Sequence, residues 1–379
     1  MTMRAPSTPW WRIVAAGVAL VLAVVLGWRG LTEPAPQAPW PPTRAYPAQA
    51  TTVSRGNDPM DRYRGRAWEL FFTRPDRPSA KSLRGGVDAP LAQALRAARD
   101  DLAVAIYHLD LWSVRDALLD AHHRGVRVRL VVDQEHITPE IEALRDAGIP
   151  VVADRGQGLM HHKFVVIDGE EVWTGSMNFT VHGAYSNANH MLRVRSRRLA
   201  QDYLREFDEM FVDGRFGPAS LADTPYPHVT VNGVDMEALF SPDEHPQARL
   251  VPLLRRAQED ILLLAYTWTA DPLTDALIEA HRKGVAVTGW VEASKLDASG
   301  HDYGRMREAG LDVLPDPLPA LLHHKVLVID GYTVVLGSYN FTHSADARND
   351  ENVLIVDDAD LAAAFFTWWQ EVRHDEATP

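Results

Sequence analysis

Apolar and polar positions follow one another along the chain in blocks that predict strands alternating with helices. Residues 102–106 and 126–132 are short apolar runs with the length and composition of buried strands. Between them, residues 114–123 carry apolar side chains at helical spacing, and Gly125 follows as a typical helix end. Strands that alternate with helices in this way predict an α/β sandwich.

This pattern occurs twice in the chain. Residues 102–133 match residues 261–292 at an offset of 159. The segment LMHHKFVVIDGEEVWTGSMNFT at 159–180 matches LLHHKVLVIDGYTVVLGSYNFT at 321–342 at an offset of 162. Such a repeat predicts two similar halves, which we place at residues 61–217 and 228–379, with residues 217–233 as the connecting segment.

Residues 1–30 are predicted to be a membrane-targeting segment. Residues 13–28 form an uninterrupted apolar run of 16 residues, preceded by Arg4 and Arg12, and as a helix it spans about 24 Å. We expect an uncleaved signal anchor, because no small-x-small cleavage site follows closely; a cleaved signal peptide is the alternative. Residues 31–60 are interpreted as a Pro-rich tether, and the body would then lie outside the cytoplasm, anchored or secreted.

The charge disfavours a protein that holds nucleic acid by its phosphate backbone. The formal net charge is −13, and residues 218–379 hold 11 basic and 26 acidic side chains, a net −15. Non-specific nucleic-acid binding draws most of its affinity from released counterions and needs a basic surface. A local basic groove stays compatible with this balance. The absence of cysteine excludes disulfides and Cys-ligated metal sites.

The period of a strand assigns the motif residues to two faces. Positions two apart share a face, so His161 and Lys163 point one way and His162 points the other. The same rule sorts the second copy, in which the corresponding residues are His323, Lys325 and His324. We interpret His162 and His324 as packing residues.

The remaining motif residues have different expected roles. Asp168 and Asp330 lie seven residues beyond the motif His and therefore on the opposite face, where we expect a structural ion pair or turn. The Gly-Ser-x-Asn segment that follows forms a turn, which can direct backbone N–H groups and side chains at an anion. The candidate phosphate-binding residues are Ser176, Asn178, Ser338 and Asn340.

These side chains suit the cleavage of a phosphodiester, provided that both copies act together. One imidazole attacks phosphorus and a second protonates the departing oxygen, while ammonium and amide groups neutralise the non-bridging oxygens. Each copy supplies half of these groups. The sequence therefore predicts that the halves face each other around one site that contains His161, Lys163, His323 and Lys325.

The motifs resemble those of the phospholipase D superfamily, whose pattern the chain reproduces at both places, over roughly residues 68–372. The resemblance implies two sandwich halves about a pseudo-twofold axis, one site at their interface, a phosphohistidine intermediate, and neither metal nor other cofactor. The second copy is most similar to the branch of small bacterial endonucleases and mitochondrial cardiolipin hydrolases. In that branch an acid downstream of the motif orients the ring of the His, and here Glu351 occupies that position.

The first copy departs from this pattern, because position 189 is Asn. A carboxylate behind a His raises its pKa, whereas an amide adds no charge. We therefore expect Glu351 to support His323 as the acid/base and His161 to be the nucleophile. The family's use of its N-terminal His as nucleophile agrees, and the reverse assignment stays open.

Three further features have less specific interpretations. Tyr107 and Tyr266 occupy equivalent strand ends, as packing residues or as walls of the pocket. The segment RVRSRR at 193–198 is a solvated face, or else a strip that grips phosphates. A metal site built from the doubled His pairs would lack a carboxylate ligand on the same face, and we expect none.

Three functions fit the motifs. A phospholipase-type hydrolase acting on head-group phosphodiesters agrees with the anchor, the location and the acidic body, and includes phosphatidyl transfer to an alcohol. Its partners would be a phospholipid substrate and the membrane, with the chain as a monomer. A nuclease for single-stranded or degraded nucleic acid agrees with the motif but not with the charge. An inactive binding module would have no need of two complete motifs, so the hydrolase is our prediction.

Overall fold

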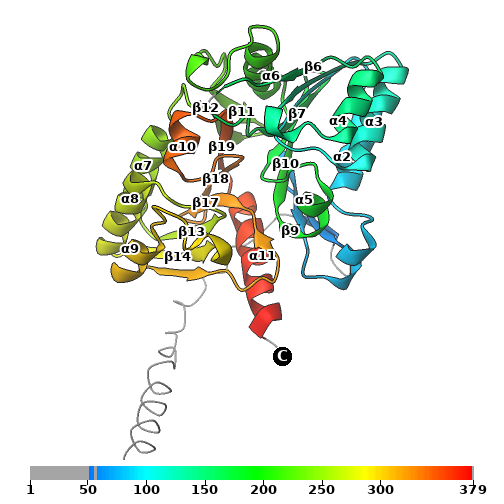
Figure 1. Ribbon diagram of the computed structural model, residues 1–379. Helices are drawn as coiled ribbons and strands as arrows, with labels where there is room; N and C mark the ends of the chain where they lie inside the picture. The colour runs from blue at the N-terminus through cyan, green and yellow to red at the C-terminus, as the bar shows by residue number, and fades with distance from the viewer. Residues whose placement is uncertain (1–50, 55–57, 157, 378–379) are drawn as a thin grey trace, which may run out of the picture. The chain divides into compact units, whose positions relative to one another are not determined.

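The computed structural model describes residues 51–54, 58–156 and 158–377. Pro47–Pro379 cluster as one compact unit, and its described residues form two large mixed β-sheets (Figure 1). The segment predicted to be a signal anchor, residues 1–30, lies outside the described residues. Among the residues that are described, no helix combines the length and the apolar character needed to cross a bilayer.

The first sheet has nine strands within the described part of the chain, in the spatial order β1-β2-β3-β10-β8-β7-β4-β5-β6. The interior strand β4 (Asp101–Ile106) is parallel to β5 (Arg127–Val132) and antiparallel to β7 (Lys163–Ile167). All six residues of β4 are buried, which explains their apolar run. The other strands are β1 (Thr51–Ser54), β2 (Met60–Arg64), β3 (Trp68–Thr73), β6 (Val151–Ala153), β8 (Glu171–Gly175) and β10 (His190–Arg195).

The second sheet repeats this order. Its eight described strands run β11-β12-β19-β18-β17-β13-β14-β15, so that β12 takes the place of β3 and β15 that of β6. The tandem α/β halves predicted from the repeat are therefore confirmed. The strands are β11 (His228–Val231), β12 (Val234–Ser241), β13 (Asp260–Ala265), β14 (Ala286–Val291), β15 (Asp312–Pro315), β17 (Lys325–Ile329), β18 (Thr333–Gly337) and β19 (Glu351–Asp357).

Helices cover the outer face of each sheet (Figure 1). They pack apolar residues onto the central strands, which gives each sheet its own core. Those of the first half are α2 (Asp88–Ala97), α3 (Trp112–His123) and α4 (Pro139–Asp146), and those of the second are α7 (Pro246–Arg256), α8 (Asp271–Arg282) and α9 (Tyr303–Glu308). Short elements at the ends of strands are α5 (Val181–Tyr185), α10 (His343–Ala347), η1 (Pro78–Ser82), η2 (Gln134–His136), η3 (Gly217–Ala219) and η4 (Ala293–Lys295).

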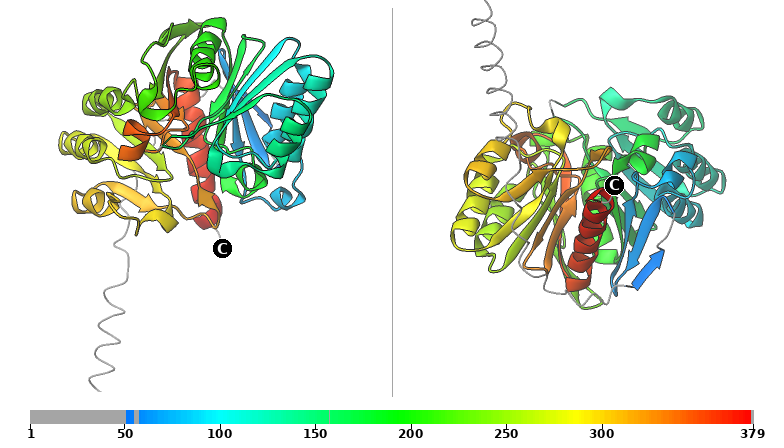
Figure 2. Two further views of the ribbon diagram at one scale, coloured as in Figure 1. Left: turned by 45° about the horizontal axis from the view of Figure 1, so that its top comes forward. Right: turned by 90° about the horizontal axis from the view of Figure 1, so that it is seen from below.

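Two longer helices lie between the sheets. Figure 2 shows α11 (Ala359–Ala377) between the two sheets, and α6 (Arg197–Phe211) covers the inner face of the first. Phe72 of β3 packs edge-on against Phe365 of α11, with ring centroids 5.0 Å apart. Tyr203 of α6 packs similarly against Phe240 of β12, at 5.1 Å. Each inner helix therefore contacts the sheet of the opposite half.

Contacts between the halves are reciprocal. The backbone N–H of His161 donates to the carbonyl of Asp350 at 3.0 Å, and that of His323 donates to the carbonyl of Ala188 at 2.9 Å. Ala188 belongs to β9 (Asn187–Ala188), which pairs with β16 (Leu321–Leu322). Reciprocal contacts between equivalent positions indicate a twofold arrangement. The two motif segments therefore meet at a pseudo-twofold seam.

Candidate active site

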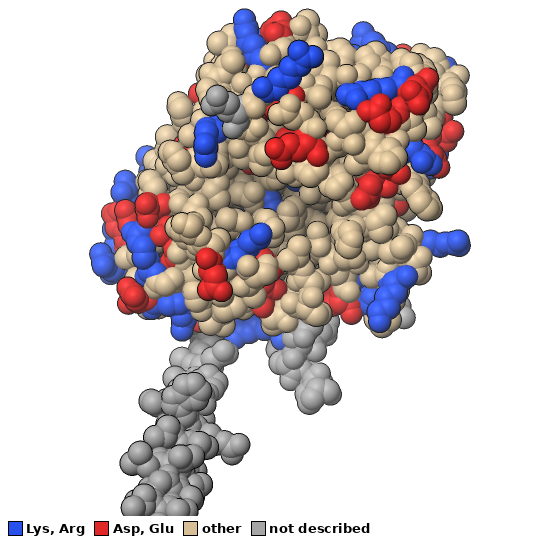
Figure 3. Space-filling model, in the orientation of Figure 1, with Lys and Arg blue, Asp and Glu red and all other residues tan. Residues whose placement is uncertain are grey.

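The two motifs start at equivalent places beside the seam. Lys163 begins β7 and pairs with Ile106 at the end of β4, while Lys325 begins β17 and pairs with Ala265 at the end of β13. The motif histidine closely precedes each strand, where the chain crosses to the other half. Figure 3 shows a hollow in this face of the molecule, with a basic side chain at its floor.

His161 is held by a residue of the opposite half. Its Nδ1 lies 2.7 Å from Oε2 of Glu351, which is fully buried. The expectation that Glu351 supports His323 is therefore wrong. Both residues belong to the second half, but β19 carries Glu351 across the seam, so it faces the histidine of the first half.

His323 has the complementary partner. Its Nδ1 lies 2.9 Å from Oδ1 of Asn189 and 3.0 Å from the carbonyl oxygen of Ser176. Nδ2 of Asn189 donates to the carbonyl of Gly183 at 2.9 Å, which fixes the amide with its oxygen towards the imidazole. The sequence correctly indicated that one histidine has a carboxylate partner and the other an amide partner. The carboxylate, however, belongs to His161 and the amide to His323.

These partners determine the tautomers. The atoms that face Nδ1 of His161 and His323 are acceptors, so Nδ1 carries the proton in each neutral ring. The two residues are only 6% and 7% exposed, and Nε2 is the atom left for a reactant. Burial, followed by the charges of Lys163 and Lys325, holds the pKa of His161 well below its usual range. The ring is therefore neutral and able to act as a nucleophile.

Two buried lysines provide the positive charge. Nζ of Lys163 donates to the carbonyl of His161 at 2.6 Å, and Nζ of Lys325 donates to that of His323 at 2.9 Å. Burial lowers the pKa of Lys163 to about 7, and burial also lowers the pKa of Lys325. Burial raises the pKa of Glu351 to about 8 in the empty site, while Lys163 and the hydrogen bond from Ser338 oppose this effect. Positive charge that develops on His161 during the reaction favours the carboxylate form of Glu351. A bound phosphate would favour both ammonium groups, since opposite charge stabilises the charged form.

The serines of the motifs position the partners of the histidines. Oγ of Ser338 donates to Oε2 of Glu351 at 2.8 Å, and Oγ of Ser176 donates to Oδ1 of Asn189 at 2.9 Å. Both serines are fully buried. Their expected role as phosphate ligands is therefore corrected, because each hydroxyl has a single proton and already donates it.

The asparagines of the motifs remain as expected candidates. Asn178 and Asn340 are only half-buried. Oδ1 of each is buried without a hydrogen-bond partner among the described residues. Amide oxygen and nitrogen are assigned from their contacts, so either end of these two amides can face a ligand. Their unpaired atoms make them the polar side chains of the turn that are most available to bind one.

The other motif residues lie away from the reacting centre. Oδ1 of Asp168 accepts the backbone N–H groups of Arg99, Asp100 and Asp101 at 2.8–3.1 Å, in a turn where its φ is +53°. Asp330 holds the start of β13 in the same way. Both residues fix a strand end and are not near the motif histidines.

His162 and His324 form a second, fully buried layer. Nε2 of His162 lies 2.8 Å from Oε1 of Glu206, and its Nδ1 lies 3.2 Å from Nδ2 of Asn352. Nδ1 of His324 lies 2.9 Å from Nδ1 of His190. Burial lowers the pKa of both His162 and His324. Asn352 and His190 come from the opposite half in each case, so this layer also joins the halves.

Aromatic rings line the site beside each histidine. The Tyr107 ring centroid is 4.8 Å from that of His161, and the Tyr266 centroid is 4.7 Å from that of His323. Both tyrosines are half-buried. Burial, with the nearby charge of Asp133, raises the pKa of Tyr107 to about 12, so it is a neutral hydroxyl. The sequence had left their packing and lining roles open, and the structure shows both.

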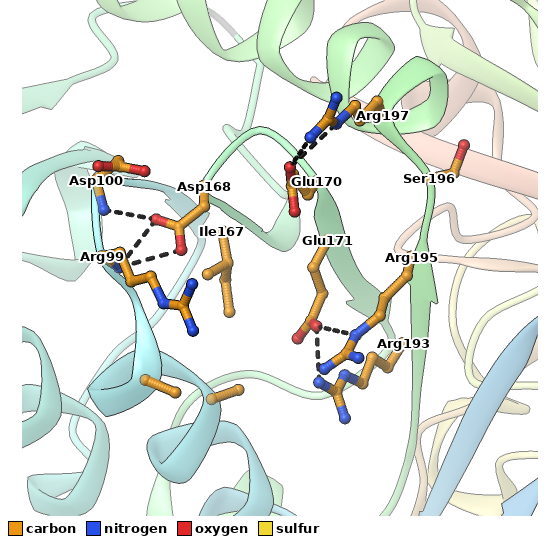
Figure 4. Close-up of a pocket in the computed structure, with 12 residues that line it drawn as sticks. Arg99, Asp100, Ile167, Asp168, Glu170, Glu171, Arg193, Arg195, Ser196 and Arg197 are labelled. Atoms are coloured by element: carbon orange, nitrogen blue, oxygen red, sulfur yellow. Dashed lines mark hydrogen bonds and ion pairs between the residues drawn. The ribbon is translucent and has the colours of Figure 1, made fainter.

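The arginines at 193–198 lie elsewhere. Arg193, Arg195 and Arg197 line a pocket of about 580 Å³ on the first half, with Glu170 and Glu171 (Figure 4). Arg193 and Arg195 pair with Glu171 at 2.7 and 2.8 Å, and Arg197 pairs with Glu170. These charges are balanced, and they lie beside Asp168 at the end of β7 that is opposite to His161. The strip is therefore a solvated, ion-paired surface.

Comparison with known proteins gives a consistent picture. Residues 91–211 and 250–372 match the family model described as "Cardiolipin synthase, PLD-like domain". The chain is 33% identical to a phospholipase D of Rickettsia typhi over 153 residues, 40% of this chain and 75% of that protein. It is 32% identical to the mitochondrial cardiolipin hydrolase of Xenopus tropicalis over 215 residues, 55% and 92% of the two chains.

A solved structure shows the same fold. The phosphatidylserine synthase of Haemophilus influenzae matches 76% of this chain and 84% of its own, with a TM-score of 0.58 at 13% identity. At that identity the similarity concerns the arrangement of the two halves alone.

Proposed function

Because the chain belongs to the phospholipase D superfamily, as its two matched domains show, we propose that it cleaves the head-group phosphodiester of phospholipids through a phosphohistidine on His161. The coarser statement, a phosphodiesterase of this superfamily, follows from the match and from the relatives. The observation that supports a phosphohistidine on His161 is the contact of His161 with Glu351 across the seam.

The first chemical step uses both halves. Nε2 of His161 attacks phosphorus, and the bond from phosphorus to the head-group oxygen breaks while His323 gives that oxygen its Nε2 proton. His323 must start this step as the imidazolium, a form that the negative charge of the bound phosphodiester favours. The phosphorylated imidazole is positively charged, with its proton on Nδ1. Glu351 stabilises this form by accepting that proton's hydrogen bond. The neutral amide of Asn189 stabilises the cationic form of His323 less than a carboxylate would. Protonated His323 is therefore a stronger acid than a histidine paired with a carboxylate.

The second step returns the enzyme to its starting state. His323, now neutral, takes a proton from water, the water oxygen attacks phosphorus, and the bond to His161 breaks. Throughout, Lys163 and Lys325 neutralise the non-bridging oxygens, with Asn178 and Asn340 as amide donors. These four groups occupy the role that a metal ion plays in other phosphodiesterases, and we propose that the reaction needs none.

Lipid is favoured over nucleic acid by charge. Residues 218–379 carry a net −15, and a protein that follows a phosphate backbone gains affinity from a basic surface. A lipid head group needs only the local charge of the site. Lipid is also the substrate class in the names of the phospholipase D and cardiolipin hydrolase relatives.

One assay tests the substrate and the metal proposals together. Protein truncated to residues 47–379, the compact unit, is incubated in EDTA with labelled phosphatidylcholine, cardiolipin or single-stranded DNA. We expect head-group release from lipid. Cleavage of DNA alone would establish the nuclease alternative, and activity that returns only with a divalent ion would overturn metal independence. Added ethanol distinguishes transfer from hydrolysis.

We also propose a location outside the cytoplasm, anchored or secreted through the N-terminal segment. Its support is the sequence of residues 1–30, two arginines before a 16-residue apolar run. When the outer layers of the cell envelope are made permeable and the inner membrane stays intact, added protease should digest the body of the chain. Protection of the body until the inner membrane is broken would contradict this location.

A further inference from the structure

Corresponding positions beside the two tyrosines carry different basic residues. His136 ends η2 after β5, and Lys295 ends η4 after β14. The repeat offset of 159 aligns the two residues, and both side chains are half-buried. The edge of the site is thus symmetric in position but asymmetric in charge.

In the second half, two ammonium groups share one aromatic ring. Nζ of Lys325 is 4.8 Å from the centroid of the Tyr266 ring, and Nζ of Lys295 is 5.1 Å from it. The two nitrogens are therefore no further apart than the sum of these two distances. Since the same ring packs against His323, Lys295 lies on the side of the histidine assigned to protonate the leaving group.

The first half has no second lysine at this place. The His136 ring lies 4.3 Å from the Tyr107 ring and stacks on His108 at 4.6 Å, with 10° between the planes. Burial, then His136, lowers the pKa of His108, so this imidazole is neutral at neutral pH. A permanent extra charge is therefore confined to the side of the second half.

The choice of lysine at position 295 stands out against the rest of the chain. Only five of the 38 basic residues Lys and Arg are lysine, and three of them, Lys163, Lys295 and Lys325, surround Tyr107 or Tyr266. Lys283, on the outside of the second half, forms an ion pair with Glu279 at 3.0 Å. Lys295 forms no ion pair with an acid among the described residues, so its charge is available to a ligand.

We propose that Lys295 binds a second phosphate on the leaving-group part of the substrate. This inference rests on the proposed function, in which His323 protonates the leaving oxygen. Two phosphates joined through a three-carbon glycerol bridge are up to about 7 Å apart when the bridge is extended, and closer when its bonds are rotated. That separation is shorter than the largest span that the contacts with Tyr266 allow between Lys325 and Lys295. The preferred substrates are then lipids whose head group carries a phosphate of its own.

The test uses two lipids that differ only in that phosphate. Wild type and Lys295→Gln are compared on phosphatidylglycerol and phosphatidylglycerol phosphate, each diluted in phosphatidylcholine vesicles. Loss of a charge-assisted contact should lower kcat/KM for the second lipid roughly 10- to 100-fold, mainly through KM. We expect a change within about twofold for phosphatidylglycerol, which lacks the partner that Lys295 would bind. Lys283→Gln removes an equal charge outside the site and should behave like wild type on both lipids.

The outcomes separate this inference from the function on which it rests. Equal effects of Lys295→Gln on both lipids would overturn the inference, while lipid hydrolysis itself would still support the proposed function. If neither lipid were cleaved and an oligonucleotide were, both proposals would fail. The unfolding midpoint of Lys295→Gln should equal that of wild type, because a structural role for the contact with Tyr266 would lower it.

Discussion

Each catalytic histidine has one side-chain hydrogen-bond partner at Nδ1, which comes from the other half. Nδ1 of His161 meets a carboxylate, whereas Nδ1 of His323 meets an amide. A carboxylate at Nδ1 stabilises any form of the ring that bears positive charge, whether protonated or phosphorylated. The difference between Glu351 and Asn189 therefore gives the two histidines different chemistry, although a lysine, a serine and a tyrosine occupy equivalent places around both.

The first prediction concerns Glu351→Gln. The amide can still accept a hydrogen bond from His161 but supplies no charge to the phosphorylated ring, so kcat should fall at least about 100-fold, as when an orienting carboxylate is amidated in a hydrolytic triad. Single-turnover kinetics with a labelled substrate measure this step. The matched control is Glu237→Gln, which makes the same chemical change at a glutamate of β12 that pairs with Arg249 of α7. This variant should retain activity.

Trapping identifies the nucleophile in the same series. In His323→Ala, a substrate with a good leaving group no longer needs the acid, so label should accumulate on His161. Label that appears on His323 in the His161→Ala protein, and never on His161, would reverse the roles.

The second prediction follows from the lowered pKa of Lys163, about 7. A lysine whose pKa is lowered loses its charge as the pH rises through that value, so the empty site becomes less positive above pH 7. Sulfate keeps its charge between pH 6 and 9, and its inhibition constant should rise by up to about tenfold per pH unit above 7. Calorimetry in two buffers should show proton uptake on binding at pH 8; constant affinity and no uptake would contradict the shift.

At this scale the sequence was sufficient to identify the residues but not their partners. Two identical motifs and the strand period placed His161, Lys163, His323 and Lys325 correctly around the seam. The partner of each histidine depends on how the halves face each other, whereas proximity along the chain suggests a partner in the same half. His136 and Lys295 were missed because neither belongs to a motif; their equivalence in the repeat was the available signal.

At the scale of elements, the site depends on the turn after β8 and after β18. A Cβ on Gly175 would lie 2.3 Å from the carbonyl oxygen of His190, and one on Gly337 would lie 2.2 Å from that of Asn352. Close approach of the neighbouring strand allows Ser176 and Ser338 to reach the partners of the histidines. The glycine of each motif is therefore required by packing and not by contact with substrate.

The third prediction is that Gly337→Ala destabilises the protein and disturbs the site. The added Cβ must push β19 away, and φ is +145° at this position, so the free energy of unfolding should fall by at least about 1–3 kcal/mol. Activity should fall further than stability explains, because Glu351 moves with β19. Denaturant titration and kcat/KM measure the two effects. Gly304→Ala, in α9 with open space around it, is the control and should be neutral or stabilising.

Elements were the level at which sequence reasoning agreed best with the structure. The apolar run predicted at 102–106 corresponds to β4 at Asp101–Ile106, and the helix predicted at 114–123 corresponds to α3 at Trp112–His123. Hydrophobic periodicity is local, so it can be read without knowing the tertiary arrangement. The seryl hydroxyls were misassigned because their partners lie on an adjacent strand, 13 residues away in each copy.

At the scale of the whole compact unit, the seam is a buried polar layer between two apolar cores. Oγ1 of Thr174 donates to Oδ1 of Asn352 at 2.6 Å, and Nδ2 of Asn352 contacts His162. All three side chains are fully buried. Buried polar groups are costly when they lose their partners, so separating the halves would expose this layer at a large cost. The two sheets should therefore unfold together.

The fourth prediction tests this coupling with Asn352→Ala in the protein truncated to residues 47–379. The substitution leaves Thr174 and His162 of the first half without their partner, which should cost about 1–3 kcal/mol of unfolding free energy. If the seam makes one cooperative unit, calorimetry will show a single transition in both proteins, with equal calorimetric and van't Hoff enthalpies. Hydrogen exchange should then speed up equally in β4 and β13, which are corresponding interior strands of the two sheets. Lys283→Ala, a change on the exposed surface of the second half, should leave both strands as in wild type. A variant with two transitions, in which only β13 exchanges faster, would show that the halves fold independently and that the seam forms after them.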